Sequence, residues 1–196
     1  MKHFIYFSSK AVTSGKALAS QDLMKAGRMD IAIHSFIQGV FLSHGIREDV
    51  VFHFIFYGMP DPPKHIEIQI NSELEISKKD IGNLIKKILY KYKKNKKAEV
   101  FPGCFIEKKS FLNVVQELLD KEVQVFLLDE KGQDIRQIEI NKDCAFILGD
   151  HKGLPSKEMK RLKRSLQLIS VGPKTYFASQ TIAVVNNELD RRAALE

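Results

Sequence analysis

The stretch FILGDHKGLP, residues 146–155, decides the fold class of this 196-residue chain. Its apolar start continues from Ala145, and such a run is typical of a strand that is covered on both faces. Gly149 and Gly153 permit backbone conformations and close approaches that a Cβ atom would obstruct. We therefore expect a buried strand, a tight ligand-binding loop and a helix with Ser156 as its N-cap residue. An ordinary turn from strand to helix is the alternative interpretation.

Strands and helices alternate on both sides of this stretch, because apolar residues recur with a period of two or at spacings of three and four. We expect strands at residues 2–7, 50–57, 65–70, 123–128 and 166–171. We expect helices at residues 29–43, 77–92, 110–119, 156–164 and 179–189. Loops or turns are expected at residues 11–26, 100–105 and 129–133. The alternation predicts an α/β fold with a mainly parallel sheet and helices on both faces.

The composition is that of one globular domain. Hydrophobic residues make up 44% and charged residues 28% of a chain that is long enough to bury a core. We expect a single domain over residues 1–192, and the closing Ala-Ala-Leu-Glu at 193–196 resembles a tail derived from an expression vector. The net charge of +7 favours an anionic partner, and nucleic acid is the commonest such partner of a basic protein.

Several functional classes find no support in the sequence. Cys104 and Cys144 are far apart and the six histidines do not group as ligands, so we expect no metal and a reducing, cytoplasmic location. No apolar stretch approaches the roughly 20 residues of a membrane span, and no signal peptide is recognisable. Neither a P-loop nor a Gly-x-Gly-x-x-Gly fingerprint is present, which argues against kinases and Rossmann dehydrogenases. His151, between two glycines, is the one histidine placed for a functional role; a hydrogen bond to local backbone is the alternative.

A run of basic residues follows the helix expected at 77–92. Residues 91–97 include five lysines. We interpret Lys93, Lys94, Lys96 and Lys97 as contacts to phosphate groups of RNA, because neutralising phosphates releases counterions and strengthens binding. The alternative is a solvated helix end with no ligand.

Longer motifs point to a known class of enzymes. Three segments toward the carboxyl end are VFLLDEKG at 125–132, FILGDHKGLP at 146–155 and ISVGPKTYFASQTIAVVNNELDRR at 169–192. They resemble the cofactor-binding half of SPOUT-class RNA methyltransferases. The segment AGRMDIAIHSFIQGVFLSHGIREDVVFHFIFYGMPDPP at 26–63 is similar to the TrmY family, the archaeal tRNA pseudouridine-54 N1-methyltransferases. The most specific motifs are Gly27-Arg28-x-Asp30, LSHGIREDV at 42–50 and the loop GDHKG.

The resemblance implies a fold and a cofactor. In SPOUT-class proteins a deep trefoil knot at the carboxyl end binds S-adenosylmethionine through three loops. The corresponding residues here are Leu128, Gly149, Val171, Gly172, Pro173, Lys174, Thr175 and Tyr176. A further family contact near the start of the last helix falls at Thr181, where archaeal members commonly carry cysteine. No metal is implied, because the sulfonium already activates the methyl group.

The resemblance also implies a substrate site. N1 of pseudouridine must lose its proton as it attacks the methyl group, so negative charge develops on the ring. A carboxylate can accept or relay that proton, and an arginine can stabilise the charge. We therefore interpret Asp30 as the base or base-positioning group and Arg28 as the contact to the ring or a phosphate. A surface pair at a helix start is the alternative. Arg47 is a second candidate for substrate binding, or forms a structural ion pair with Asp49.

The expected partners are structured RNA, most specifically tRNA, and a second copy of the chain. Ile182, Val185 and Leu189 form an apolar face of the last helix, which suits either a homodimer interface or the core. Two other functions stay open. One is a basic RNA-binding protein of the same fold with altered or lost catalysis. The other is methylation of a different base in tRNA or rRNA.

Overall fold

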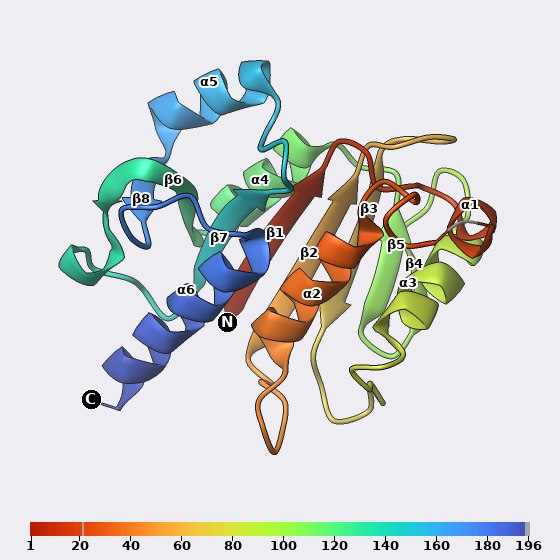
Figure 1. Cartoon of the computed structure of the whole chain (residues 1–196), viewed down its shortest axis with the longest axis horizontal. Helices are drawn as coiled ribbons and strands as arrows, with labels where there is room; N and C mark the ends of the chain where they lie inside the picture. The colour runs from red at the N-terminus through yellow and green to blue at the C-terminus, as the bar shows by residue number, and fades with distance from the viewer. Residues whose placement is uncertain (21, 195–196) are drawn as a thin grey trace.

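The computed structural model describes residues 1–20 and 22–194, which form one sheet flanked by helices (Figure 1). The strands are β1 (Lys2–Ser8), β2 (Val50–Phe56), β3 (Lys64–Gln69), β4 (Ala98–Phe101), β5 (Cys104–Glu107), β6 (Gln124–Asp134), β7 (Cys144–Gly149) and β8 (Gln167–Ser170). The helices are α1 (Gly15–Ala19), α2 (Met29–Val40), α3 (Ile81–Tyr90), α4 (Phe111–Asp120), α5 (Ser156–Ser165) and α6 (Ala178–Ala193), with a short 3-10 turn at Ile135–Gln137.

The sheet has two halves that differ in strand direction. Its order is β4-β5-β3-β2-β1-β7-β6-β8. The five strands from β2 to β8 in this order are parallel, whereas β3, β5 and β4 are joined by antiparallel pairs. The parallel strands therefore all end at one edge, which we call the carboxyl edge. Ligands of open α/β sheets bind at such an edge.

Helices cover both faces of the sheet, as the sequence predicted. One buried cluster contains Phe36 of α2, Ile85 of α3 and Val185 of α6. The other cluster contains Val114 of α4 and Leu162 of α5. The mainly parallel α/β fold is thus confirmed, while the trefoil knot stays a prediction.

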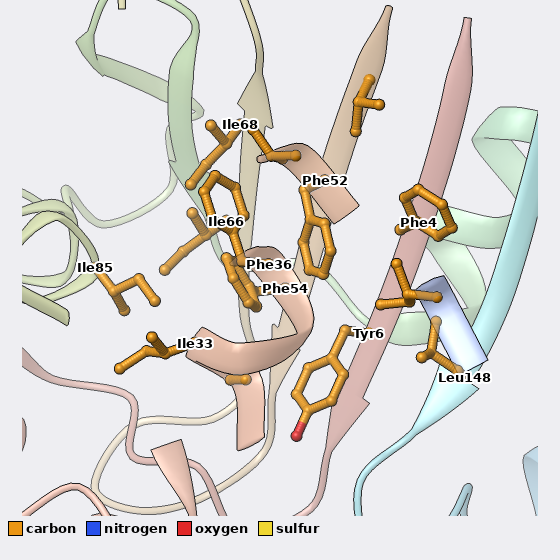
Figure 2. Packing of buried hydrophobic residues seen from close by; sticks show 14 of the residues in the cluster. Phe4, Tyr6, Ile33, Phe36, Phe52, Phe54, Ile66, Ile68, Ile85 and Leu148 are labelled. Carbon is orange, nitrogen blue, oxygen red and sulfur yellow. The ribbon is translucent and has the colours of Figure 1, made fainter. Parts of the chain in front are cut away.

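Aromatic packing fixes α2 on the sheet. Figure 2 shows Phe36 facing Phe52 and Phe54 of β2, with Phe4 and Tyr6 of β1 beside them. The ring centroids of Phe36 and Phe52 are 5.2 Å apart, and the rings of all five residues are fully buried. Each such side chain stabilises the fold by roughly 1.5 to 3 kcal/mol through burial.

Three loop predictions differ from the structure. Residues 100–105 form the β4–β5 hairpin, because Gly103 at φ 71° reverses the chain and lets both strands pair. Residues 129–133 belong to β6, but Leu128 and Gln133 both pair with Ile169 of β8, so residues 129–132 bulge out of the pairing between them. Within the segment 11–26, Ser14 caps the short helix α1 by accepting a hydrogen bond from the Ala17 amide.

The structure also decides the expectations about the N-cap residue of α5, the apolar face of α6 and the end of the chain. Pro155, not Ser156, is the N-cap residue of α5, and Ser156 begins the helix. Ile182, Val185 and Leu189 are buried against the core, so the core alternative holds and the expected dimer face is wrong. Of the expected vector tail, Ala193 ends α6, and residues 195–196 lie outside the described part of the chain.

A row of imidazoles crosses the sheet on the face away from α2. His3 Nδ1 lies 3.0 Å from His53 Nε2, and His53 Nδ1 lies 2.9 Å from His65 Nε2. His65 Nδ1 lies 3.1 Å from a carboxylate oxygen of Glu107, which ends the row. Burial lowers the pKa of His3 to about 4 and that of His53 well below its ordinary value of 6.5. His3 and His53 are therefore held in the neutral form.

We expect the free energy of unfolding to fall as the pH drops from about 6.5 to about 4. In that range the unfolded chain binds a proton at His3 and the folded chain does not, so the loss is complete near the lowered pKa. The contribution of His3 should be about 1 to 3 kcal/mol. Urea unfolding across this range should show a smaller loss for His3→Gln. The exposed-loop variant His44→Gln should match the parent chain, and parallel curves for all three proteins would contradict the prediction.

Candidate functional site at the carboxyl edge

A cavity of about 530 Å³ opens at the carboxyl edge. Its lining comes from loops that follow β1 and β2, from α1, from the start of α2 and from the turn after β7. Among the described residues, the lining includes the cations Lys10, Lys25 and Arg28 and the imidazole of His151, and it includes no carboxylate residue. Such a site attracts an anionic ligand or a group that develops negative charge.

Arg28 and Asp30 form a two-pronged ion pair at the start of α2. Arg28 Nε and Nη2 each donate a hydrogen bond of 3.0 Å to one carboxylate oxygen of Asp30. This contact lowers the pKa of Asp30 and raises that of Arg28. Asp30 is thereby a weaker proton acceptor than an isolated carboxylate, and the geometry favours its role in positioning Arg28.

Close backbone packing places this pair beside the loop after β1. Gly27 has φ 74°, and a Cβ atom there would lie 1.8 Å from the carbonyl oxygen of Lys10. Arg28 itself has φ 63° and serves as the N-cap residue of α2. The glycine therefore lets Arg28 reach the cavity, which accounts for the Gly-Arg-x-Asp motif in structural terms.

The GDHKG loop forms a tight turn at the end of β7. A Cβ atom on Gly149 would lie 2.6 Å from the carbonyl carbon of Gly153, and Gly153 has φ 71°. The buried Asp150 accepts hydrogen bonds of 2.7 Å from the Ser8 hydroxyl and 2.8 Å from the Lys152 amide. His151 lies at the tip of this turn and lines the cavity. The turn thus presents the His151 side chain to the cavity, which supports the expectation of a ligand-binding loop.

The predicted cofactor loops lie side by side, beyond the β7 turn. Leu128 pairs with Ile169 at the β6–β8 contact. The Thr175 hydroxyl donates a hydrogen bond of 2.6 Å to Glu130, which joins the loop after β8 to the irregular part of β6 between Leu128 and Gln133. Because β7, β6 and β8 are neighbours, Leu128, Gly149 and the run from 171 to 176 reach the same edge. Thr181 follows in the first turns of α6, where it is partly buried.

Arg47 lies away from the cavity. It precedes β2, so it is at the opposite edge of the sheet from the cavity. Its guanidinium donates hydrogen bonds of 2.6 and 2.5 Å to Asp190 of α6, and its side chain is 11% exposed. Asp49 instead pairs with Lys2 at 2.9 Å. The structure therefore does not bring Arg47 to the cavity, and the Arg47–Asp49 ion pair was wrong.

The lysine segment lies toward the carboxyl edge, because it leads into Ala98, which pairs with Ile106 near the end of β5. It follows Tyr90, whose ring packs against Gly15 at the start of α1, and Ala17 of α1 lines the cavity. Lys97 pairs with Glu67 at 2.9 Å. The other three predicted contacts, Lys93, Lys94 and Lys96, are exposed and have no ion pair within the described residues.

Sequence patterns missed three polar residues of this region. Ser8 carries no motif, because its partner Asp150 is 142 positions away, and Lys10 meets the other cavity residues only in the folded chain. The Tyr6 hydroxyl is buried and has no hydrogen-bond partner among residues 1–20 and 22–194. Burial raises the pKa of Tyr6, and the Asp150 and Asp30 carboxylates raise it further. A protonated phenol thus lies close to both acids.

Two other features lie apart from the cavity. Ligand atoms of His53, His65 and Glu67 lie within 4.8 Å of one another, which is the spacing of a metal site. The two histidines belong to the imidazole row, where their facing nitrogens are hydrogen-bonded to each other. In the described ranges, we find no helix with the length and apolar character needed to cross a membrane.

Comparison with known proteins identifies the family. A family model described as "Putative SAM-dependent RNA methyltransferase" matches residues 1–194. The chain belongs to that family. A protein of Methanococcoides burtonii named tRNA (pseudouridine(54)-N(1))-methyltransferase is 34% identical to this methyltransferase, over 97% of this chain and 96% of the relative. The protein of the same name from Thermococcus kodakarensis is 32% identical, over 97% and 99%.

A solved structure gives the same fold for this methyltransferase. Archaeoglobus fulgidus Nep1 bound to S-adenosylhomocysteine superposes with a TM-score of 0.66 at 16% identity, over 98% of both chains. The resemblance to the TrmY family and to the SPOUT fold is thereby confirmed.

The turn after β7 gives a first prediction about this methyltransferase. We expect Gly149→Ala to lower the free energy of unfolding by about 1 to 3 kcal/mol, because the new methyl group would overlap the Gly153 backbone. Affinity for S-adenosylmethionine should also fall, because the same methyl group would displace a turn that carries a predicted cofactor contact. Gly45→Ala is the control, because a Cβ atom there meets nothing within 4 Å. Equal unfolding midpoints for the two variants would refute the packing argument.

The lysine segment gives a second prediction. Replacing Lys93, Lys94 and Lys96 by alanine should reduce the slope of log affinity for RNA against log salt by about 2 to 3. Filter binding at several salt concentrations measures this slope. The double variant Lys79→Ala, Lys121→Ala is the control. It removes exposed charges at the sheet edge opposite the carboxyl edge and should leave the slope nearly intact. An unchanged slope in the triple variant would exclude these lysines from the RNA interface.

Proposed function

We propose that this enzyme transfers a methyl group from S-adenosylmethionine to N1 of a pseudouridine in tRNA. Relatives that align over nearly the whole chain carry that activity in their names. The observation that carries the proposal is the Arg28–Asp30 pair in a cationic cavity next to the loops after β6, β7 and β8. This arrangement suits a reaction in which negative charge develops on a base beside a bound sulfonium.

Arg28 has the geometry to stabilise that charge. Two of its nitrogens are engaged by Asp30, which fixes the guanidinium plane. Nη1 has no hydrogen-bond partner in the part of the chain that the structure describes, so it can donate to a uracil carbonyl or a phosphate. Asp30 then acts as the positioning group. Fixing the arginine before the reaction avoids the cost of reorganising it in the transition state.

The residues proposed to hold the cofactor are Leu128, Gly149, Val171, Gly172, Pro173, Lys174, Thr175, Tyr176 and Thr181. Their chemistry fits S-adenosylmethionine. Leu128 and Val171 offer partly buried apolar surface for an adenine ring, and the carboxylate of Glu130 between the loops suits ribose hydroxyls. When bound, the cofactor supplies a methyl group on a sulfonium, whose departure leaves a neutral thioether. The protein has to align and shield the reactants.

The cellular location, the RNA substrate and the oligomeric state are proposed from the family. We propose that the enzyme works in the cytoplasm on tRNA and as a homodimer. Phe177 and Val184 at the surface of α6 are 73% and 36% exposed, and they are apolar groups that a second copy could cover. Light scattering on the purified protein tests the homodimer, which a mass near 22.4 kDa would exclude.

The deciding experiment measures binding and transfer in one preparation. Calorimetry with S-adenosylmethionine should show a single site, and labelled methyl groups should reach tRNA hairpins that contain pseudouridine and not those that contain uridine. Transfer to uridine alone would replace the proposal with methylation of another base. Binding of RNA with no transfer to either would favour the RNA-binding protein without catalysis.

Asp30→Asn tests the arginine pair. The neutral amide cannot hold Arg28 by two charge-assisted hydrogen bonds, so we expect transfer to pseudouridine to slow by about 10 to 100-fold. Affinity for S-adenosylmethionine should change by less than about threefold, because the cofactor loops lie across the β7 turn. Asp120→Asn, on α4, is the matched control and should keep full activity. Parent-like turnover of Asp30→Asn would remove the pair from the reaction.

A further inference from the structure

The proposed reaction needs a proton acceptor, and Asp30 is poorly suited to be one. Both of its oxygens already accept hydrogen bonds from Arg28. The other cavity residues that carry ionisable side chains are Lys10, Lys25 and His151. Lysine is protonated at neutral pH, whereas a neutral imidazole is the usual general base of enzymes in that range.

We propose that His151 accepts the N1 proton of pseudouridine during methyl transfer, with Asp150 as its positioning residue. The inference rests on the proposed function and names the base for that reaction. It is carried by the place of His151 in the cavity lining and by the buried carboxylate next to it.

The position of His151 in the fold suits this role. The cavity lies over the ends of β1 and β2, and the proposed cofactor loops lie at the ends of β6 and β8. In the sheet, β7 separates these two pairs of strands. The turn at the end of β7 therefore marks the boundary where a base in the cavity would meet a methyl group from the cofactor side. His151 lies at the tip of that turn, and its side chain is 37% exposed.

Asp150 is built to orient the imidazole. Its side chain is fully buried, and the Ser8 hydroxyl and the Lys152 amide fix its two oxygens. The second oxygen, Oδ1, lies 4.0 Å from His151 Nδ1. A small rotation of the exposed imidazole would make this contact a hydrogen bond, and such bonds are often long before the substrate binds. Nδ1–H would then donate to Asp150 and leave the Nε2 lone pair for the substrate.

The charges around His151 support both halves of the step. Lys10, Lys25 and Arg28 share its cavity and favour negative charge on the substrate ring. The Asp150 carboxylate, with Oδ1 4.0 Å from His151 Nδ1, is a counter-charge for the positive charge that develops on the imidazole as it accepts the proton.

The step balances as follows. The N1–H bond of pseudouridine breaks and its proton moves to Nε2 of His151. The N1 electron pair forms a bond to the methyl carbon of S-adenosylmethionine, and the electrons of the S–CH3 bond return to sulfur. The products are N1-methylpseudouridine, S-adenosylhomocysteine and an imidazolium, which then releases its proton to water.

The test compares His151→Asn with His44→Asn, an exposed histidine at the opposite edge of the sheet. Single-turnover transfer to pseudouridine RNA is followed from about pH 5 to about pH 9 at saturating cofactor. General base catalysis contributes about 10² to 10⁴-fold, so His151→Asn should slow the step by that factor. The rate of the parent enzyme should fall as the pH is lowered, and the rate of His151→Asn should not show this fall. His44→Asn should keep the parent rate and profile. Added imidazole should partly restore His151→Ala.

Asp150→Asn separates orientation from proton transfer. It should slow the step, because the imidazole is no longer held in place. It should also move the fall in rate at acidic pH to a lower pH, because the protonated imidazole loses the negative charge of Asp150. The inference fails if the rate of His151→Asn is within about threefold of the parent rate. It also fails if the variant raises only KM and its pH profile matches that of the parent. The parent enzyme is assayed first: if it does not methylate pseudouridine, the proposed function fails, whereas an active parent with an active His151→Asn variant overturns only the role of the histidine.

Discussion

A buried hydrogen bond from the Ser8 hydroxyl to the Asp150 carboxylate ties the two halves of the site together, beside the 2.9 Å backbone bond from the Asp150 amide to the Phe7 carbonyl. It spans 142 residues of sequence and joins the end of β1 to the turn after β7. The same hydroxyl accepts a hydrogen bond of 3.0 Å from the Ala11 amide, so it also shapes the loop after β1. A buried carboxylate without such partners would cost several kcal/mol. The position of the turn and that of the loop therefore depend on each other.

The loop after β1 is in turn the support for the rest of the cavity. A Cβ atom on Gly27 or Gly58 would lie within 2.4 Å of the backbone of this loop, so the start of α2 and the loop after β2 pack directly onto it. The Thr13 hydroxyl donates a hydrogen bond of 2.9 Å to the Gly58 carbonyl. Three segments distant in sequence thus meet with little freedom to shift. A reaction that relies on alignment benefits from such rigidity.

The positive charge of the chain is divided between structural and available cations. Arg47 is paired with Asp190, and Arg191 and Arg192 both contact the buried carboxylate of Glu188. Lys64 is buried beside Asp61. Among the described residues, Lys10 of the cavity and Lys93, Lys94 and Lys96 of the lysine segment have no ion pair, whereas Lys25, Arg28 and Lys97 do. The net charge predicted an anionic partner, but only the pairing pattern shows which cations are placed to meet it.

Sequence alone determined most of the strands and helices, because apolar periodicity is a local property of the chain, but it missed α1 and the β4–β5 hairpin. It also determined the family, through motifs such as Gly27-Arg28-x-Asp30 and the turn at 149–153, where close backbone contacts require glycine. The tertiary structure decided which polar groups meet. The contacts of Ser8 with Asp150 and of Arg47 with Asp190 join residues more than 140 positions apart, and no local pattern records such a contact. The strand order brings the β7 turn between the cavity and the cofactor loops, and it arises from packing of the whole sheet.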